Sequence, residues 1–582
     1  MHIRTNPRAV TLQETLQLAR RYQSVGRLKE AERICKVVLR AQPENVDALH
    51  MLGLLYHQRG DSTGAEHFLR RVIGLLPSFS AAHNNLGIVL QSQGRMEHAV
   101  ACYRSALALN PDYHDAHHNL GLALRGLGQH EQALVHCERS VSLKPDSAES
   151  HRNLAHALHA VGRTEEAVLS LRRAIVLQPD SQEVRKDLGT LLVGLDRFDE
   201  AAICYEQSIL LKPDNPEAHN YLGLALQKVG KYAQAENAFR AALRLEPGYA
   251  EAHANLSMLL LLLGRFEEGW REFEWRNMPA PPAKRTRDAL QSMGDVPVLG
   301  KTGVWDNRPH DFTKPLWRGE SLENKVLLIS MEFGFGDTIQ FCRYVPIVGS
   351  NARVVLEVQS ALKRLVSQLP GADQVVAYGD ALPAFDFYCP LMSLPHILGT
   401  TVHNIPAQIP YLSADASRVA AWRARLAPYK GKRIGLAWAG NPALVRDRQR
   451  SIAFERLASL ELPGVVFVSL QKGEAAGELR SHPFGQRVHD WTDDLADFAE
   501  TAALIDNLDL VISVDTAVVH LAGALGKPVW LLNRFDTCWR WLLEREDSPW
   551  YPGLRQYRQS RAGDWESVLE RVRDALLQWR DE

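Results

Sequence analysis

One spacing dominates the first half of this chain: a proline recurs every 34 residues. The prolines stand at positions 43, 77, 111, 145, 179, 213 and 247. Ten residues after each comes a small residue, namely Gly53, Gly87, Gly121, Ala155, Gly189, Gly223 and Ser257. A second small position holds Ala31, Ala65, Ala99, Ala133, Ala167, Ala201, Ala235 and Gly269. Three positions that share one period over seven units indicate a repeat architecture.

The period predicts helix–turn–helix units. The small residues let two helices approach closely, and proline ends the second helix because it lacks an N–H and clashes with the preceding turn. A large apolar residue follows the second small position by four residues, as at Leu69, Tyr103 and Phe239. Cys35 and Cys137 share that position. We therefore expect both cysteines in the core, where free cysteine is common.

These positions resemble those of tetratricopeptide repeats over about residues 12–249, with a partial eighth unit to about residue 277. Such repeats stack into a superhelix with a concave groove, which usually holds a peptide or protein. We therefore expect residues 1–277 to form an α superhelix that recruits a protein partner.

Asparagines recur on the first helix of the repeats, two residues before the first small position. They are Asn85, Asn119, Asn153 and Asn255, in a series interrupted by Asp187 and Tyr221. A carboxamide can bridge the N–H and C=O groups of a peptide. The repeat array of the O-GlcNAc transferase family has a similar ladder, and the resemblance implies an acceptor-peptide groove. The alternative is that asparagine is simply tolerated on these helices.

Composition narrows the functional classes. The 67 Lys and Arg residues balance 68 Asp and Glu, so bulk charge gives no reason to expect a nucleic-acid partner. Seven cysteines without a CxxC pair exclude a disulfide scaffold and a clustered zinc site, and they fit a reducing compartment. The N-terminus lacks a signal-peptide core, and the longest apolar run is too short to span a bilayer. We expect a soluble cytoplasmic protein.

The period breaks at residues 278–322, where proline and glycine are dense. We interpret this segment as a linker whose Trp305 and Trp317 dock on a neighbouring domain. Beyond it, apolar strands are predicted at 326–330, 352–358, 386–390, 433–440, 465–470, 510–514 and 528–532. Helices are predicted at 362–369, 420–426 and 497–508. Alternation of apolar strands and helices indicates two α/β units with parallel sheets, and ligands bind at the carboxyl ends of such strands, here in a cleft between the units.

Two loops follow such strands. In EFGFGDTIQFCRY (332–344), Gly334 and Gly336 permit close backbone approach, but the third glycine of a dinucleotide fingerprint is absent. Asp337 would repel a phosphate, so it fits a general base better, unless it merely caps the next helix. In SVDTAVVHLAGALGKP (513–528), Asp515 or Thr516 can cap a helix whose first N–H groups suit a diphosphate. His520 lies about one turn after Thr516, and its alternative role is that of a core histidine.

The stretches FGFGDTIQFCRY, LAWAGNPALVRDRQRSI, SLQKGE and SVDTAVVHLAGALGKPVW resemble GT-B nucleotide-sugar glycosyltransferases, especially the heptosyltransferase-like group. The resemblance covers about residues 315–580. It implies a GT-B fold of two Rossmann-like domains, an acceptor-side domain at 323–412 and a donor domain at 413–582. The whole layout resembles bacterial repeat-fused glycosyltransferases, some of which are thought to glycosylate flagellin.

The resemblance also implies roles for individual residues. Asp337 matches the position of the proposed base. Asp515, Thr516 and His520 match the donor-phosphate motif, although Ala517 replaces its usual glycine. The full set of candidate donor-binding residues is Gly334, Gly336, Gly440, Asn441, Arg448, Arg450, Lys472, Asp515, Thr516 and His520. The arginines and Lys472 would stabilise departing negative charge, or Asp447 and the two arginines would only form a surface salt-bridge cluster.

The resemblance leads us to expect a glycosyltransferase that moves a sugar from a nucleotide-sugar donor to a protein acceptor recruited by the repeats, and flagellin is one candidate acceptor. No cofactor and no divalent ion are expected, since metal-spaced carboxylates and an Asp-x-Asp motif are absent. Two alternatives stay open: transfer to a glycan or lipid-linked acceptor, and a non-catalytic repeat scaffold with a degenerate transferase domain. The sugar, the nucleotide and the oligomeric state are not determined by the sequence.

Overall fold

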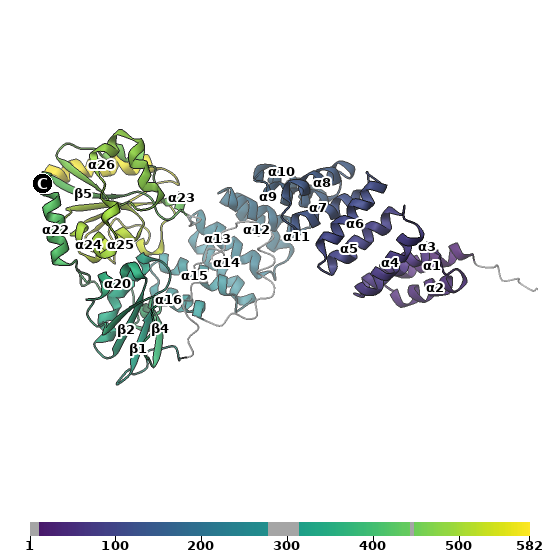
Figure 1. The fold of residues 1–582 in the computed structure, drawn as a ribbon, viewed down its shortest axis with the longest axis horizontal. Helices are drawn as coiled ribbons and strands as arrows, with labels where there is room; N and C mark the ends of the chain where they lie inside the picture. The colour runs from purple at the N-terminus through teal and green to yellow at the C-terminus, as the bar shows by residue number, and fades with distance from the viewer. Residues whose placement is uncertain (1–10, 278–313, 443–446, 582) are drawn as a thin grey trace, which may run out of the picture. The chain divides into compact units, whose positions relative to one another are not determined.

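The computed structural model describes residues 11–277, 314–442 and 447–581. The chain divides into two compact units within helix α13, between Ala218 and His219. Within the described residues, the first unit contains 11–218, and the second contains the last repeats together with everything from residue 314 onward. In Figure 1 the first unit is built of helices, and the second combines helices with two sheets.

The repeats are pairs of helices, as predicted. These helices are α1 (Leu12–Ser24), α2 (Leu28–Ala41), α3 (Val46–Gln58), α4 (Ser62–Leu75), α5 (Ser80–Ser92), α6 (Met96–Leu109), α7 (His114–Gly126), α8 (His130–Leu143), α9 (Ala148–Ala160), α10 (Thr164–Leu177), α11 (Gln182–Gly194), α12 (Phe198–Leu211), α13 (Pro216–Lys228), α14 (Tyr232–Leu245), α15 (Ala250–Leu262) and α16 (Phe266–Phe273). Each even-numbered helix from α2 to α14 ends two residues before one of the recurring prolines. The repeat pattern therefore marks real helix ends.

The residue at the first small position has to be small because a large side chain lies against it. A Cβ added at Gly87 would lie 2.5 Å from the ring of Tyr103, and one at Gly223 would lie 2.5 Å from that of Phe239. Cys35 and Cys137 occupy the same large-residue position and are buried, as expected. Burial raises the pKa of both thiols to about 11, so they stay protonated core residues.

The second unit contains two parallel sheets, which confirms the predicted α/β class. The four-stranded sheet, in the order β3-β2-β1-β4, contains β1 (Val326–Ser330), β2 (Arg353–Val358), β3 (Gln374–Ala377) and β4 (Phe387–Pro390). The six-stranded sheet, in the order β10-β9-β8-β5-β6-β7, contains β5 (Lys432–Ala437), β6 (Val465–Ser469), β7 (Val488–His489), β8 (Leu510–Val514), β9 (Val529–Asn533) and β10 (Leu554–Arg558). Every strand pair in both sheets is parallel.

The second unit also contains α-helices and 3-10 turns outside the paired repeat helices. The α-helices are α18 (Phe335–Phe341), α19 (Val345–Gly349), α20 (Ser360–Val366), α21 (Leu394–Ile397), α22 (Ala416–Leu426), α23 (Asp447–Arg450), α24 (Phe498–Asp506), α25 (Ala517–Ala524) and α26 (Trp565–Asp581). The 3-10 turns are η1 (Glu274–Asn277), η2 (Cys342–Tyr344), η3 (Leu391–Ser393), η4 (Phe454–Leu460), η5 (Glu474–Ser481), η6 (Pro483–Arg487), η7 (Thr492–Asp494) and η8 (Trp539–Trp541). Among the described residues, no helix is both long and apolar enough to cross a membrane.

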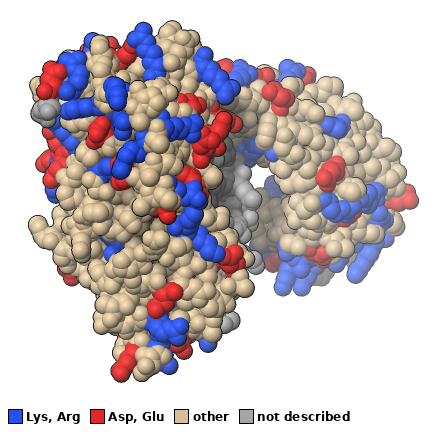
Figure 2. All heavy atoms as spheres, turned by 60° about the vertical axis from the view of Figure 1, so that its left-hand side comes forward, with Lys and Arg blue, Asp and Glu red and all other residues tan. Residues whose placement is uncertain are grey.

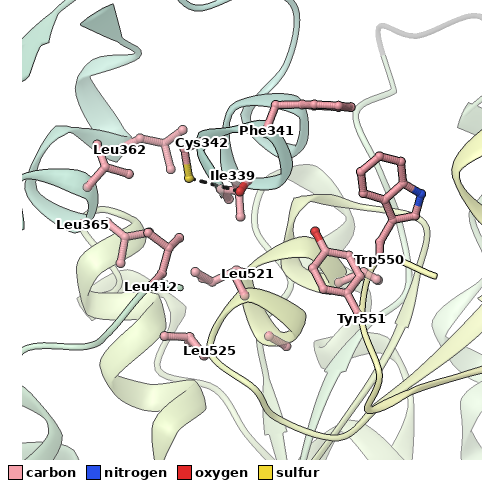
Figure 3. Packing of buried hydrophobic residues seen from close by; sticks show 14 of the residues in the cluster. Ile339, Phe341, Cys342, Leu362, Leu365, Leu412, Leu521, Leu525, Trp550 and Tyr551 are labelled. Carbon is pink, nitrogen blue, oxygen red and sulfur yellow. Dashed lines mark hydrogen bonds between the residues drawn. The ribbon is translucent and has the colours of Figure 1, made fainter. Parts of the chain in front are cut away.

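One hydrophobic cluster joins the elements that follow β1 and β8. Ile339 of α18, Leu521 of α25 and Tyr551 all belong to it and are buried (Figure 3). Figure 3 also shows Leu362 and Leu365 of α20 facing the same core. The cleft that we predicted between two α/β units is therefore filled by side chains at this depth. Gly334 is exposed, and Asp337, Asp515 and Thr516 are half-buried.

The end of the repeat array packs into the same cluster. Phe266, Trp270 and Phe273 of α16 are buried in it, and Trp270 lies edge-on to Trp539 with ring centroids 5.2 Å apart. Just beyond α16, the buried Arg276 donates hydrogen bonds of 3.1 and 2.9 Å to the two carboxylate oxygens of Glu332, which precedes the glycine-rich loop. The last repeat is thus a structural part of the α/β unit.

The predicted linker is described only from residue 314 onward. There, Trp317 docks as expected: it is buried, and its backbone N–H donates to Tyr388 O at 2.8 Å. Trp305 lies outside the described residues. Acidic and basic side chains are mixed over the face shown in Figure 2, in keeping with the net charge of −1.

Candidate active site

Two of the predicted loops come together at the carboxyl ends of β1 and β8. The helix after β1, α18, packs directly on the helix after β8, α25. A Cβ added at Gly336 would lie 2.9 Å from Cδ2 of His520 and 3.6 Å from Cα of Ala517. A side chain at position 336 would not fit in this approach. The backbone one residue before Asp337 thus lies against the first turn of α25.

Asp337 has two partners. Its carboxylate accepts a hydrogen bond of 3.0 Å from the backbone N–H of Gly334, which caps α18. It also forms an ion pair with Nη2 of Arg540. The capping role that we considered as an alternative is thus present, and the ion pair adds a second role that the local sequence did not indicate. Directly before this cap, Phe333 adopts a φ of +57°, a left-handed conformation that is uncommon for a bulky residue.

Arg540 is the cation that sequence reasoning missed. It lies on η8, and besides Asp337 it donates from Nε to Oε1 of Gln340 at 2.7 Å and from Nη1 to Sγ of Cys538 at 3.2 Å. Burial alone would lower the pKa of Arg540, but the charge of Asp337 raises it above its ordinary value. The guanidinium therefore remains charged in an almost closed environment.

His520 is a buried neutral imidazole. Its Nδ1 lies 3.0 Å from the hydroxyl of Tyr551, and its ring stacks on Trp541 with centroids 5.4 Å apart. Burial lowers the pKa of His520 well below the usual 6.5, and the charges of Arg540 and Arg343 lower it further. These contacts fit the alternative of a core histidine, although His520 also lies directly against the glycine-rich loop.

This depressed pKa predicts that acid destabilises the second unit. The unfolded chain protonates His520 near pH 6.5, whereas the folded chain does not. The stability contributed by neutral His520 is therefore complete above pH 6.5 and is lost as the pH falls below it, by up to about 1.4 kcal/mol per pH unit. Urea unfolding between pH 7.5 and 5 should show a shallower loss for His520→Gln than for the parent chain. The exposed His403, replaced by Gln, serves as control, and equal slopes for both variants would contradict the assignment.

The N-terminus of α25 lacks a side-chain cap. Thr516 is the N-cap residue, but its side chain makes no capping hydrogen bond and instead lies 3.2 Å from the hydroxyl of Ser513. Asp515 does not cap the helix either; its carbonyl accepts a hydrogen bond of 2.9 Å from Nη1 of Arg450. The capping that we expected is therefore wrong. Within the part of the chain that the structure describes, no side chain caps the first backbone N–H groups of α25, which is the condition for anion binding there.

The loop after β5 holds a compact polar network. Arg450 Nε donates to Asp447 Oδ1 at 2.9 Å, and Ser451 donates to the other oxygen of Asp447 at 2.8 Å. A Cβ at Gly440 would overlap Asp447 and Arg450, so this loop requires glycine there. Arg450 thus joins the loops after β5 and β8. Asn441 and Arg448 are exposed and lie on either side of residues 443–446, which are not described.

Lys472 lies at the end of β6. Its Nζ donates to the carbonyl oxygens of Thr492 and Leu495 at 2.6 and 3.1 Å. The ammonium group of Lys472 therefore lies against the 3-10 turn η7. The neighbouring Gln471 was missed: its Oε1 accepts from the N–H groups of Trp438 and Ala439 at 2.9 and 2.8 Å. Gln471 therefore fixes the backbone that leads into the Gly440 loop.

The asparagine ladder is tied together from repeat to repeat. Asn119 donates to Asn84 at 3.0 Å, and Asn255 donates to Asn220 at 2.9 Å. Asn85 and Asn153 contact His50 and His118 in the same way, with the partner always 35 residues earlier. The buried Asp187 that interrupts the ladder binds Arg152, also 35 residues earlier. Asn85, Asn119 and Asn153 lie in the first unit, and Asn255 lies in the second.

Models of known families match stretches in both halves of the chain. Tetratricopeptide repeat models match residues 16–83, 89–128, 112–179, 189–230 and 216–249. The N-terminal helices are tetratricopeptide repeats. A model described as glycosyltransferase family 9 (heptosyltransferase) matches residues 495–532, which include β8, α25 and the Asp515–His520 loop. The chain thus combines tetratricopeptide repeats with a region similar to glycosyltransferase family 9.

Individual relatives cover parts of the chain. Protein FlbA of Caulobacter vibrioides is 29% identical over 335 residues, which are 53% of this chain and 52% of FlbA. The match therefore spans about half of the length of that relative. Among solved structures, a crystal structure of MamA is 27% identical and covers 29% of this chain, with a TM-score of 0.26. The structure of Pseudomonas aeruginosa PilF is 23% identical and covers 36% of this chain, with a TM-score of 0.33. These two structures match 92% and 95% of their own chains.

Proposed function

We propose that the protein transfers a sugar from a nucleotide-sugar donor to a protein acceptor recruited by the tetratricopeptide repeats, flagellin being one such acceptor. The observation that carries the proposal is that the loop holding Asp337, which pairs with Arg540, packs at Gly336 against the uncapped first turn of α25. A carboxylate next to an anion-binding helix end is what an acceptor hydroxyl and a departing diphosphate require. The family 9 match over the same helix supports this assignment.

The proposed reaction is a single displacement with inversion. Asp337 accepts the proton of the acceptor hydroxyl while the oxygen of that hydroxyl bonds to the anomeric carbon of the sugar. The bond from that carbon to the phosphate oxygen breaks, and the electron pair leaves with the nucleoside diphosphate. N–H groups of α25 stabilise the developing charge. We propose that no divalent ion is needed, so transfer should be the same with and without a chelator.

The repeats would supply the acceptor. Each ladder asparagine uses an amide N–H to bind the preceding repeat, and a carboxamide offers a second N–H and an oxygen besides. Asn85 and Asn119 are half-buried and are the members best placed to contact a peptide backbone. The seven free cysteines fit the cytoplasmic location that we propose.

The first test is binding of nucleoside diphosphates. We expect one of UDP, GDP, ADP, CDP or dTDP to raise the melting temperature, because a ligand bound only by the folded chain stabilises it by about 2.7 kcal/mol at 100 times its Kd. The matching nucleoside without phosphates is the control. If none of the five shifts the transition, the proposed function is wrong.

Ala517→Pro provides a matched variant for this test. Proline at the first helical position removes one N–H of α25 and is otherwise tolerated there. The preceding Thr516 already has φ −135 and ψ 174, the extended conformation that proline requires of its predecessor. We expect nucleoside diphosphate affinity to fall by about tenfold, with the melting temperature of the ligand-free chain unchanged. Unchanged affinity would place the phosphate elsewhere.

A further inference from the structure

Arg540 is held at the meeting point of three parts of the second unit. Trp539 before it packs against Trp270 at the end of the repeats, and Trp541 after it stacks on His520 of α25. The guanidinium itself reaches α18, where it binds Asp337 and Gln340. Its two flanking tryptophans are 6% and 0% exposed, so the backbone that carries Arg540 is firmly fixed.

One side chain that binds the Arg540 guanidinium, Gln340, has a buried donor without a partner among the described residues. Gln340 is fully buried, and its Oε1 accepts from Arg540, whereas its Nε2 has no hydrogen-bond partner among the described residues. An unpaired buried amide donor costs free energy. The arrangement therefore favours a state in which an additional acceptor atom arrives beside Gln340 and Arg540.

The charges point to the kind of acceptor. Asp337 lies on Arg540, and Asp515, which precedes the uncapped end of α25, is near enough to act on it electrostatically. A diphosphate at this helix end would face two carboxylates. The guanidinium of Arg540 pairs with Asp337 and is influenced by the charge of Asp515, and its fork of N–H donors suits phosphate oxygens.

We propose that Arg540 exchanges partners during the reaction: it binds Asp337 in the donor-free protein and turns to the diphosphate when the nucleotide-sugar binds, which frees Asp337 to act as the base. This proposal rests on the proposed transferase function. In the transfer step, the acceptor oxygen bonds to the anomeric carbon, its proton passes to Asp337, and the electron pair of the broken carbon–oxygen bond leaves on the phosphate that Arg540 binds. Arg540 would thereby couple donor binding to activation of the acceptor.

The exchange is tested by calorimetry of the intact chain with whichever of UDP, GDP, ADP, CDP or dTDP binds it. Asp337→Asn removes the competing partner of Arg540, so affinity should rise by about fivefold. Adding Arg540→Gln to Asp337→Asn removes the guanidinium when no carboxylate is present at 337, and affinity should then fall by about 10- to 100-fold. The double variant leaves no unpaired buried charge from this pair, so it should fold.

The affinities of these variants decide whether Arg540 contacts the diphosphate. Equal affinity of Asp337→Asn with and without Arg540→Gln shows that Arg540 makes no contact with the diphosphate and overturns the proposal. Should the glutamine variant fail to fold, Arg540→Lys in the Asp337→Asn background keeps the charge but loses the fork, and an affinity equal to that of Asp337→Asn would again overturn it. If the parent chain binds none of the diphosphates, the proposed function itself fails, which is a different result.

Discussion

Sugar transfer by Asp337→Asn is expected to be about 10²- to 10⁴-fold slower than transfer by the parent chain, because a positioned general base contributes a factor of that size. Asparagine is nearly isosteric and can still accept the hydrogen bond from Gly334 N–H that caps α18. The change therefore removes the proton acceptor and the negative charge that pairs with Arg540, while it keeps the cap of α18. The measurement is transfer of labelled sugar from the donor whose nucleotide stabilises the chain, with nucleoside diphosphate binding determined in parallel.

A second carboxylate in the same unit provides the control. Asp497 also combines a helix cap with an arginine partner: it accepts from the N–H of Ala499 at 2.9 Å and from Arg364 at 2.5 Å. Asp497→Asn should cost similar stability without loss of transfer. If Asp337→Asn and Asp497→Asn lose activity equally, or if Asp337→Asn loses transfer only because it no longer binds nucleotide, Asp337 has a structural role and is not the base.

Most of the fold follows from local patterns in the sequence. The repeats are predictable because every unit has small, large and proline residues at the same positions. In the structure the second helix of each unit ends just before its proline. The seven predicted strands are all present within a few residues. The three that were missed, β3, β7 and β10, are all edge strands. Edge strands are short or carry polar residues such as the Arg555 of β10, so they lack the continuous apolar run of a buried strand.

The candidate site was only partly predictable. Gly336, Asp337 and the Asp515–His520 loop are brought together, because both follow parallel strands and so reach the same kind of sheet edge. Arg540 was missed because its partner lies 203 residues away, and its own segment reads as aromatic packing. A signal for the ladder contacts did exist: a polar residue such as His50 or Asn84 stands one position before the ladder in each preceding repeat.

The union of the last repeat with the α/β unit predicts a large loss of stability for Trp270→Ala. Trp270 is 1% exposed, and its ring meets both Trp539 of η8 and Phe341 of α18 edge-on, at 5.2 and 5.9 Å between centroids. Truncating a buried tryptophan to alanine removes its apolar contacts and leaves a cavity, at a cost of about 3–5 kcal/mol. Since the chain has two compact units, guanidinium unfolding should be followed for the transition that contains the sheets.

The same substitution tests whether the repeats position the site. Trp539 and Phe341 flank Arg540 and α18, so the cavity should also loosen the ion pair between Arg540 and Asp337 and weaken nucleoside diphosphate binding. Leu245→Ala at the 43% exposed end of α14 is the control, because little apolar contact is lost there. A Trp270→Ala chain as stable as the Leu245→Ala chain would show that the packing of Trp270 does not hold the last repeat on the α/β sheets. A destabilised chain with unchanged affinity for the nucleoside diphosphate would show that Trp270 stabilises the fold but does not position the site.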